Sequence, residues 1–358
     1  MHNQLRSRKL NSLPEVLKSL PKIELHRHLE GSLRLSTLGE IAHQHGVDMQ
    51  SLDMEELRPL VQMTDDEPNF QEFLAKFTVL RRFYSTREAI MRIAYEVVAD
   101  AAVDNIKYME LRFNPVALAF HQGFGFEEVS DWVIAAVDKA QQDYDIRVQL
   151  IVQMGRHEPQ FARRLAELAV DRREQGIIAL DLAGDEEHFS AEKFIDVMHW
   201  ARDQGMHIIA HAGECRNCPA SNVYEAVEVI GAERIGHGVH AINDENVVEL
   251  LKRKQITLEM CPTSNLQTGS IYSLVRHPLR YYHSVGIPVT INTDDPSISN
   301  ITLTDEYLVA CEGIGIHFSD LKTMILNAAR ATFLPDLERK KLVADFERDL
   351  AEFAIEDN

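Results

Sequence analysis

Cysteine is scarce in this sequence, and long uncharged apolar runs are missing from it. Only 4 of the 358 residues are cysteines, too few to hold a chain of this length together by disulfide bonds. No apolar stretch approaches the roughly 20 residues that a membrane-spanning helix needs. No signal-peptide core follows the basic residues near the N-terminus either. The sequence therefore predicts a cytoplasmic protein that contacts no membrane.

Positive charge is also in short supply. The chain has 37 lysines and arginines against 56 aspartates and glutamates, which gives a formal net charge of -19. Proteins that bind nucleic acids use a surplus of basic residues to replace the counterions of the phosphate backbone. We therefore expect no nucleic-acid partner. A neutral or cationic small molecule, or a bound metal ion, fits this composition better.

Glycine-rich phosphate loops, low-complexity linkers and internal repeats do not occur. Instead, eight strand-like runs alternate with helical ones. The strands are expected at residues 22–26, 106–112, 146–154, 176–182, 207–212, 234–238, 256–260 and 287–293. Repeated right-handed βαβ units close naturally into a (β/α)8 barrel, also called a TIM barrel. Without a phosphate loop an open doubly wound α/β sheet is less favoured, and we expect one domain over residues 1–358.

Helical patterns fill the rest of the chain. Helices between the strands are expected at residues 127–142, 161–175, 191–204, 222–230 and 244–254. A polar leader spans residues 1–21, a helical insertion without strands spans residues 34–100, and helices beyond residue 305 are expected to cover the barrel ends. The insertion carries apolar residues at helical spacing, namely Phe70, Phe73, Leu74, Phe77 and Leu80. Such a stripe indicates a packed helix, and part of it is expected to act as a lid with an apolar wall over a pocket.

Histidines and acidic residues follow several of the predicted strands. In a (β/α)8 barrel the carboxyl ends of all strands meet at one mouth, which would bring together His26, His28, His211, Glu214, His237, Asp294 and Asp295. Three imidazoles and one carboxylate suit a divalent transition metal, with zinc the first candidate. We expect the ligands to be His26, His28, His211 and Asp294. Each has a structural explanation when taken alone, but their joint placement on separate strand ends favours a metal site.

A catalytic zinc ion keeps one position open for water and lowers the pKa of that water toward about 7. His237 is expected to orient this water. Glu214, three residues beyond a ligand, is expected to act as a general acid or base. Asp295, which stands beside a ligand carboxylate, could share the catalytic role of orienting the water or bind the substrate. Asp294 and Asp295 would repel each other without a cation nearby, which supports the metal site.

Six segments carry a resemblance to a known family: PKIELHRHLEGSLR, LDLAGDE, HAGE, RIGHG, CPTSNLQTG and NTDDP. Together with NAARATFLP they extend in order from Pro21 to about Pro335. In this combination the chain resembles the adenosine deaminase family of the amidohydrolase superfamily. The resemblance implies a zinc-bearing (β/α)8 barrel enzyme that converts adenosine and 2'-deoxyadenosine to inosine and 2'-deoxyinosine plus ammonia.

The resemblance also implies a role for each matching residue. One zinc ion per chain would be held by His26, His28, His211 and Asp294. Glu214 would protonate the purine at N1, and His237 would orient the attacking water. The substrate would contact His28, Glu30, Asp295 and the backbone at Gly184. Glu30 stands where adenosine deaminases usually carry Asp, so the preference for the sugar is less well defined than the chemistry.

Other functions remain open at this stage. The same scaffold could deaminate adenine or another aminopurine, and a catalytically inactive relative could bind nucleosides alone. The zinc deaminases of the cytidine type use a P-C-x-x-C motif with an upstream H-x-E. Cys215 and Cys218 lack both features, so we interpret them as two thiols in a loop and, less readily, as a second metal site. Glu110, Arg112 and Arg156 are expected to form structural ion pairs.

Overall fold

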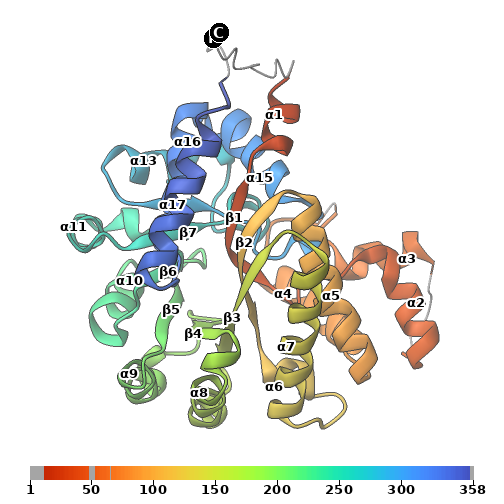
Figure 1. Ribbon diagram of the computed structural model, residues 1–358. Coiled ribbons are helices and arrows are strands. Elements are labelled where there is room, and N and C mark those ends of the chain that lie inside the picture. Colours follow the sequence, from red (N-terminus) through yellow and green to blue (C-terminus); the bar gives the residue numbers. More distant parts are fainter. Residues whose placement is uncertain (1–11, 48–52, 65, 355–358) are drawn as a thin grey trace.

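The structure is a computed structural model that describes residues 12–47, 53–64 and 66–354. Within these residues, eight parallel strands form one sheet in which each strand pairs with the next along the chain. Figure 1 shows the strands in the middle of the molecule with helices around them. The predicted (β/α)8 barrel is therefore confirmed.

All eight predicted strands form. They are β1 (Lys22–His28), β2 (Ile106–Phe113), β3 (Arg147–Gly155), β4 (Ile177–Ala183), β5 (His207–Ala212), β6 (Arg234–His237), β7 (Thr257–Met260) and β8 (Val289–Ile291). The first and last strands meet through a bridge between Arg27 and Asp294. Both faces of β1 are buried, as expected for a parallel sheet that is covered by helices on one side and filled on the other.

The helices are α1 (Leu13–Ser19), α2 (Leu35–His45), α3 (Met54–Val61), α4 (Phe70–Leu80), α5 (Arg87–Val103), α6 (Pro115–Ala119), α7 (Phe126–Asp143), α8 (Ala162–Asp171), α9 (Ile195–Asp203), α10 (Ser221–Glu225), α11 (Glu245–Lys254), α12 (Pro262–Gln267), α13 (Leu279–Ser284), α14 (Pro296–Ser299), α15 (Leu303–Leu308), α16 (Phe318–Ala331) and α17 (Asp336–Leu350). The five helices predicted between strands correspond to α7, α8, α9, α10 and α11. In α7, Val129, Val133, Val137 and Ala140 are buried at helical spacing, which explains why one face packs on the barrel. None of the helices in the described ranges combines the length and apolar character that a membrane crossing requires.

The insertion between β1 and β2 holds α2, α3, α4 and α5, and no strand interrupts its described residues. The predicted polar leader lies partly outside the described residues, and its described part forms α1. The C-terminal helices differ in place from the expectation. α16 packs against β8 and β1, and α17 packs against α16. These helices therefore cover the side of the barrel where β8 meets β1.

Charged side chains fill part of the barrel interior. Arg112 lies 2.7 Å from Asp181 and 2.8 Å from Glu259. Arg234 pairs with Glu110 and with Glu259. All five side chains are almost fully buried, so each charge needs a partner, because an unpaired buried charge is strongly destabilising. The ion pairs predicted for Glu110 and Arg112 are present and lie beneath the mouth of the barrel.

Candidate active site

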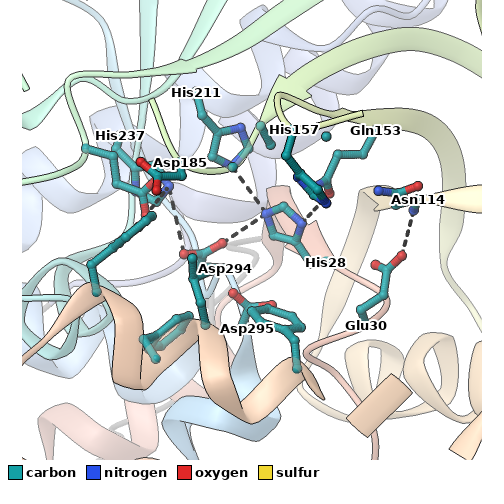
Figure 2. A pocket seen from close by; sticks show the side chains of 18 of the residues that line it. His28, Glu30, Asn114, Gln153, His157, Asp185, His211, His237, Asp294 and Asp295 are labelled. Atoms are coloured by element: carbon teal, nitrogen blue, oxygen red, sulfur yellow. Dashed lines mark hydrogen bonds and ion pairs between the residues drawn. The ribbon is translucent and has the colours of Figure 1, made fainter. Parts of the chain in front are cut away.

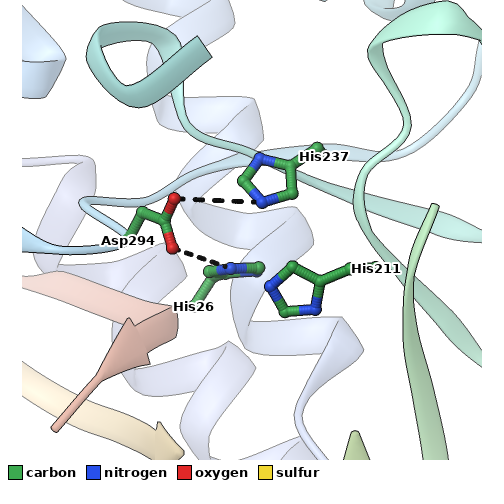
Figure 3. Close-up of side chains that lie close together, drawn as sticks. All are labelled: His26, His211, His237 and Asp294. Carbon is green, nitrogen blue, oxygen red and sulfur yellow. Dashed lines mark ion pairs between the residues drawn. The ribbon is translucent and has the colours of Figure 1, made fainter. Parts of the chain in front are cut away.

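The side chains expected to bind a metal ion converge at the mouth of the barrel. His26 and His28 come from the end of β1, where alternate side chains point to the same face. His211 lies in β5, and Asp294 follows β8. Two backbone hydrogen bonds, both 2.9 Å long, join Asp294 to His26 and His28 where the barrel closes. Figure 3 shows Asp294 facing His26, with His211 beside it.

The distances between these groups fit a single small cation. His28 Nε2 lies 3.3 Å from the Nε2 atoms of both His26 and His211. Asp294 Oδ1 lies 3.2 Å from His26 Nε2 and 3.1 Å from His28 Nε2. Ligands that are each about 2.0–2.1 Å from a tetrahedral zinc ion are about 3.3 Å from one another. The donor types and these four separations are therefore compatible with a divalent cation such as zinc.

The opposite nitrogen of each of the three imidazoles is bound to an acceptor. The pairs are His26 Nδ1 with Glu259 at 2.8 Å, His28 Nδ1 with Gln153 Oε1 at 2.7 Å, and His211 Nδ1 with Asp181 at 3.1 Å. An acceptor on Nδ1 places the ring hydrogen there and leaves a lone pair on Nε2. Three lone pairs and a carboxylate oxygen then lie close together, where a cation would remove their mutual repulsion.

Sequence reasoning missed these three supporting acceptors. Asp181 lies within the quoted segment LDLAGDE, but no role was derived for it. Glu259 lies in β7 and Gln153 in β3, and both point into the barrel, where they pair with His26 and His28. A polar residue inside a strand that is buried on both faces was the available signal.

His237 occupies a different position from the other three histidines. Its Nε2 atom lies 3.8 Å from Asp294 Oδ2 and 3.5 Å from Glu214 Oε1. This Nε2 atom has no hydrogen-bond partner within the described residues although it is buried. Both His237 and Asp294 have positive φ angles, 62° and 63°, which are rare for these residue types and common at functional sites. His237, with His26, His211 and Asp294, also forms a group that could hold a metal ion.

Glu214 is held by the turn that follows β5. Gly213 has a φ of +65°, a conformation that glycine adopts without strain. The Glu186 carboxylate accepts hydrogen bonds from the backbone N–H groups of Gly213 at 3.0 Å, Glu214 at 2.6 Å and Cys215 at 3.3 Å. Burial, followed by the charges of Asp294 and Glu186, raises the pKa of Glu214 well above its ordinary value. The carboxyl group can therefore carry a proton, as a general acid must.

Asp295 and Glu30 are two acidic residues that line the pocket. Asp295 Oδ1 and Glu30 Oε2 are buried and have no hydrogen-bond partner within the described residues. Gly31 makes room for Asp295, since a Cβ atom on Gly31 would lie 1.8 Å from Asp295 Oδ1. The other oxygen of Glu30 accepts a 2.6 Å hydrogen bond from the backbone of Asn114, as Figure 2 shows. Burial raises the pKa of Glu30 to about 7.

A pocket of about 370 Å³ joins these groups. The predicted site residues that line it are His28, Glu30, Gly184, His211, Glu214, His237, Asp294 and Asp295, while His26 lies below them. Its apolar wall comes from α4 through Phe70, Phe73, Leu74 and Phe77. The expected apolar wall is thus present, although Leu80, the last residue of the stripe, is buried in the core instead. The volume and the mixed lining suit a small polar aromatic molecule.

Two expectations near the site were wrong. Cys215 and Cys218 are joined in a disulfide, where two thiols had been expected. The turn between them brings their Cα atoms to 5.1 Å, which is within the range that a disulfide requires. Arg156 forms no ion pair within the described part of the chain. It donates instead to the backbone oxygen of His211 at 2.9 Å and so supports that strand end.

A cluster of imidazoles and one carboxylate at the mouth of a (β/α)8 barrel is the architecture of a metal-dependent hydrolase. The family model described as adenosine deaminase matches residues 21–348. An adenosine deaminase from Shewanella denitrificans is 37% identical over 327 residues, which is 91% of this chain and 98% of that protein. The chain therefore belongs to the adenosine deaminase family, whose members are hydrolytic deaminases that act on a C–N bond.

Solved structures of related enzymes share the fold over nearly the whole chain. An adenine deaminase from Arthrobacter aurescens has a TM-score of 0.85 and 25% identity, covering 93% of this chain and 100% of its own. An Arabidopsis N6-mAMP deaminase has a TM-score of 0.82 and 28% identity, covering 93% and 99%. These relatives act on different aminopurines according to their names, so the fold alone does not define the substrate.

Proposed function

We propose that this protein is a zinc-dependent hydrolase that deaminates adenosine and 2'-deoxyadenosine to inosine and 2'-deoxyinosine, with release of ammonia. Membership of the adenosine deaminase family supports the reaction class. The observation that carries the proposal is the buried Glu214 carboxyl, 3.5 Å from His237 and beside the histidine and aspartate cluster. A proton donor, a group that can hold water and a cation site then lie around one small pocket.

His26, His28, His211 and Asp294 would hold one zinc ion. When bound, zinc supplies Lewis-acid chemistry that makes water nucleophilic near neutral pH. The second ring nitrogen of each histidine already has an acceptor, which fixes ring orientation and raises ligand basicity. The donor set and the separations of 3.1–3.3 Å between four pairs of donor atoms support zinc as the metal.

Side chains and backbone groups of this protein position the water, supply a proton and bind the purine. His237 fixes the water oxygen beside C6 of the purine. As the bond between oxygen and C6 forms, Glu214 gives its proton to N1, which removes the double bond between N1 and C6. One proton of the water then passes to the C6 amino group and the other restores the Glu214 carboxyl group, so the C6–N6 bond breaks, ammonia leaves, and the 6-oxo purine remains. Asp295 and the backbone at Gly184 would hold the purine ring in the pocket.

Glu30 supports a nucleoside substrate. Its free oxygen, Oε2, is buried and unpartnered within the described residues, and a buried acceptor in this state favours a substrate that brings a hydroxyl group. A ribose or deoxyribose hydroxyl meets this need, whereas free adenine has none. Adenine or another aminopurine is the second candidate, because the similar enzyme from Arthrobacter aurescens is named an adenine deaminase.

A spectrophotometric screen of the purified protein separates these substrates. We expect the highest kcat/KM for adenosine and 2'-deoxyadenosine, with lower values for adenine and other aminopurines. A higher value for adenine would move the proposal to the free base. Binding without turnover of any aminopurine would point to an inactive nucleoside-binding relative, which the presence of Glu214, His237 and Asp295 in one pocket disfavours.

A further inference from the structure

We propose that Asn265 and His277 fix the ring hydrogen of His237 on Nε2, so that His237 holds the attacking water as a hydrogen-bond donor and takes no proton from it. The presence of that water rests on the proposed function, whereas the position of the hydrogen follows from the hydrogen bonds alone. Asn265 and His277 are 0% and 3% exposed, and neither lines the pocket. They are therefore positioning residues that act through His237.

The hydrogen-bond chain begins at a backbone amide, which can only donate. The N–H group of Leu279 lies 3.1 Å from Nδ1 of His277, so this ring nitrogen must be an acceptor. Burial lowers the pKa of His277 to about 3, which keeps the ring neutral with a single N–H group. That hydrogen must then be on Nε2 of His277.

The hydrogen on Nε2 of His277 determines the orientation of the Asn265 amide, and this amide in turn determines which nitrogen of His237 carries hydrogen. Nε2 of His277 lies 3.1 Å from the Asn265 side-chain amide, and because this nitrogen donates, the amide must present its oxygen. The Asn265 amide nitrogen then faces His237, 3.0 Å from Nδ1. The orientation of a buried amide is assigned from its hydrogen-bond network, and here the network starts at a donor that cannot be reversed. His237 therefore accepts at Nδ1 and carries its hydrogen on Nε2.

This hydrogen points to the place where the chemistry occurs. Nε2 of His237 is buried without a hydrogen-bond partner among the described residues, and the Glu214 and Asp294 oxygens lie 3.5 and 3.8 Å away. A water oxygen can accept the Nε2–H group, but its proton cannot pass to a nitrogen that already has one. A nitrogen that carries hydrogen also has no lone pair for a metal ion. The same constraint thus favours His28 over His237 as the fourth metal ligand.

Nuclear magnetic resonance of the zinc-loaded protein with 15N-labelled histidine tests the position of the hydrogen directly. Hydrogen-bearing and bare imidazole nitrogens have well separated 15N shifts, and the signals of His237 are identified by their loss in His237→Gln. We expect His237 to show a hydrogen on Nε2 and a bare Nδ1. A bare Nε2, or a ring that is doubly protonated, would overturn the proposal. This measurement needs no substrate, so its result is independent of the proposed function.

Asn265→Asp tests the consequence for catalysis. A carboxylate can only accept, so it should draw the ring hydrogen of His237 to Nδ1 and leave Nε2 bare. The closest precedent is the wrong-tautomer variant of the serine protease triad, which loses about 10⁴ in kcat. We expect a loss of about 10²- to 10⁴-fold in kcat with a much smaller change in KM. In the 15N spectrum, the hydrogen should move to Nδ1.

Two further variants complete the design. The control variant Gln267→Glu makes the same amide-to-acid change in α12, at a residue that is not part of the series of hydrogen bonds from Leu279 to His237. The Gln267 side chain accepts a 2.7 Å hydrogen bond from Ser299. This variant should keep nearly wild-type kcat. His277→Phe removes the donor that orients Asn265, so it should lower kcat less than Asn265→Asp and leave both hydrogen positions populated. Near wild-type kcat in Asn265→Asp, with the spectral change present, would refute the catalytic role. Absence of aminopurine turnover in the wild-type protein would refute the proposed function instead.

Discussion

Removing the Glu30 carboxyl group should abolish the preference for nucleosides over the free base. Glu30 Oε2 is buried and unpartnered in the described part of the chain, and we assign it to a sugar hydroxyl. A hydrogen bond to a charged group contributes about 1.5–3 kcal/mol, and each 1.4 kcal/mol is about tenfold in affinity. Glu30→Ala should therefore lower kcat/KM for adenosine by about 10- to 10²-fold and leave the value for adenine nearly unchanged.

The surrounding loop fixes where this carboxyl group can lie. The backbone of Leu29 donates to Arg112 at 2.9 Å and its oxygen accepts from Tyr84 at 3.1 Å, so the loop cannot easily shift. In Glu30→Asp the carboxyl group is shorter by one methylene, which withdraws it by about 1.5 Å. Space for the sugar then increases while an acceptor remains. We expect this variant to keep or strengthen the preference for adenosine.

Steady-state kinetics on adenosine, 2'-deoxyadenosine and adenine check this prediction for the wild-type protein, Glu30→Ala and Glu30→Asp. Thermal unfolding provides the control, since Glu30→Ala also leaves the Asn114 N–H group without its 2.6 Å acceptor and should lower stability modestly. The reasoning is refuted if wild-type protein turns over adenine as well as adenosine. It is equally refuted if Glu30→Ala lowers kcat/KM for both substrates by the same factor.

Three further predictions concern the metal, the acid and the fit of the purine. His211→Ala should remove both zinc and activity, and full metal content by elemental analysis would contradict its role as a ligand. Glu214→Gln should reduce kcat by about 10²- to 10⁴-fold with little change in inosine binding; unchanged turnover would exclude it as the ring acid. Because the pKa of Glu214 is raised, wild-type activity should persist below that pKa and fall as pH rises through it, a fall that a pH profile measures. Gly31→Ala would place Cβ at 1.8 Å from Asp295 Oδ1, so displacement of Asp295 should cost about 10²-fold in kcat/KM, and wild-type kinetics would exclude this contact.

The strand ends could be predicted from the sequence because two simple rules apply to them. Parallel strands that are buried on both faces appear as continuous apolar runs, and a barrel brings their carboxyl ends to one mouth. His26, His211 and Asp294 follow such runs, and the structure places them within reach of one cation. Local pattern and global topology agree here, so the candidate metal site followed from the sequence.

No comparable rule predicts the disulfide or the positions of the C-terminal helices from the sequence. Whether Cys215 and Cys218 are joined depends on the turn between them, which brings their Cα atoms to 5.1 Å, and spacing alone leaves thiols and a metal site open. For α16, the helical pattern was clear, but its packing against β8 and β1 depends on where the barrel closes. Both outcomes are set by tertiary geometry that no local pattern specifies.

The role of His237 also depends on tertiary geometry that the local sequence does not specify. A strand that ends in histidine indicates a group at the barrel mouth, but it does not say whether the ring binds metal, accepts a proton or donates a hydrogen bond. That choice depends on which nitrogen carries the hydrogen, and here it is determined by the Leu279 backbone through His277 and Asn265. His237 ends β6, Asn265 lies in α12, His277 precedes α13 and Leu279 begins it, so only the folded barrel brings these residues into one series of hydrogen bonds. Residue types at strand ends therefore suffice to predict a metal site with an activated water, whereas the protonation of each group needs the hydrogen-bond network around it.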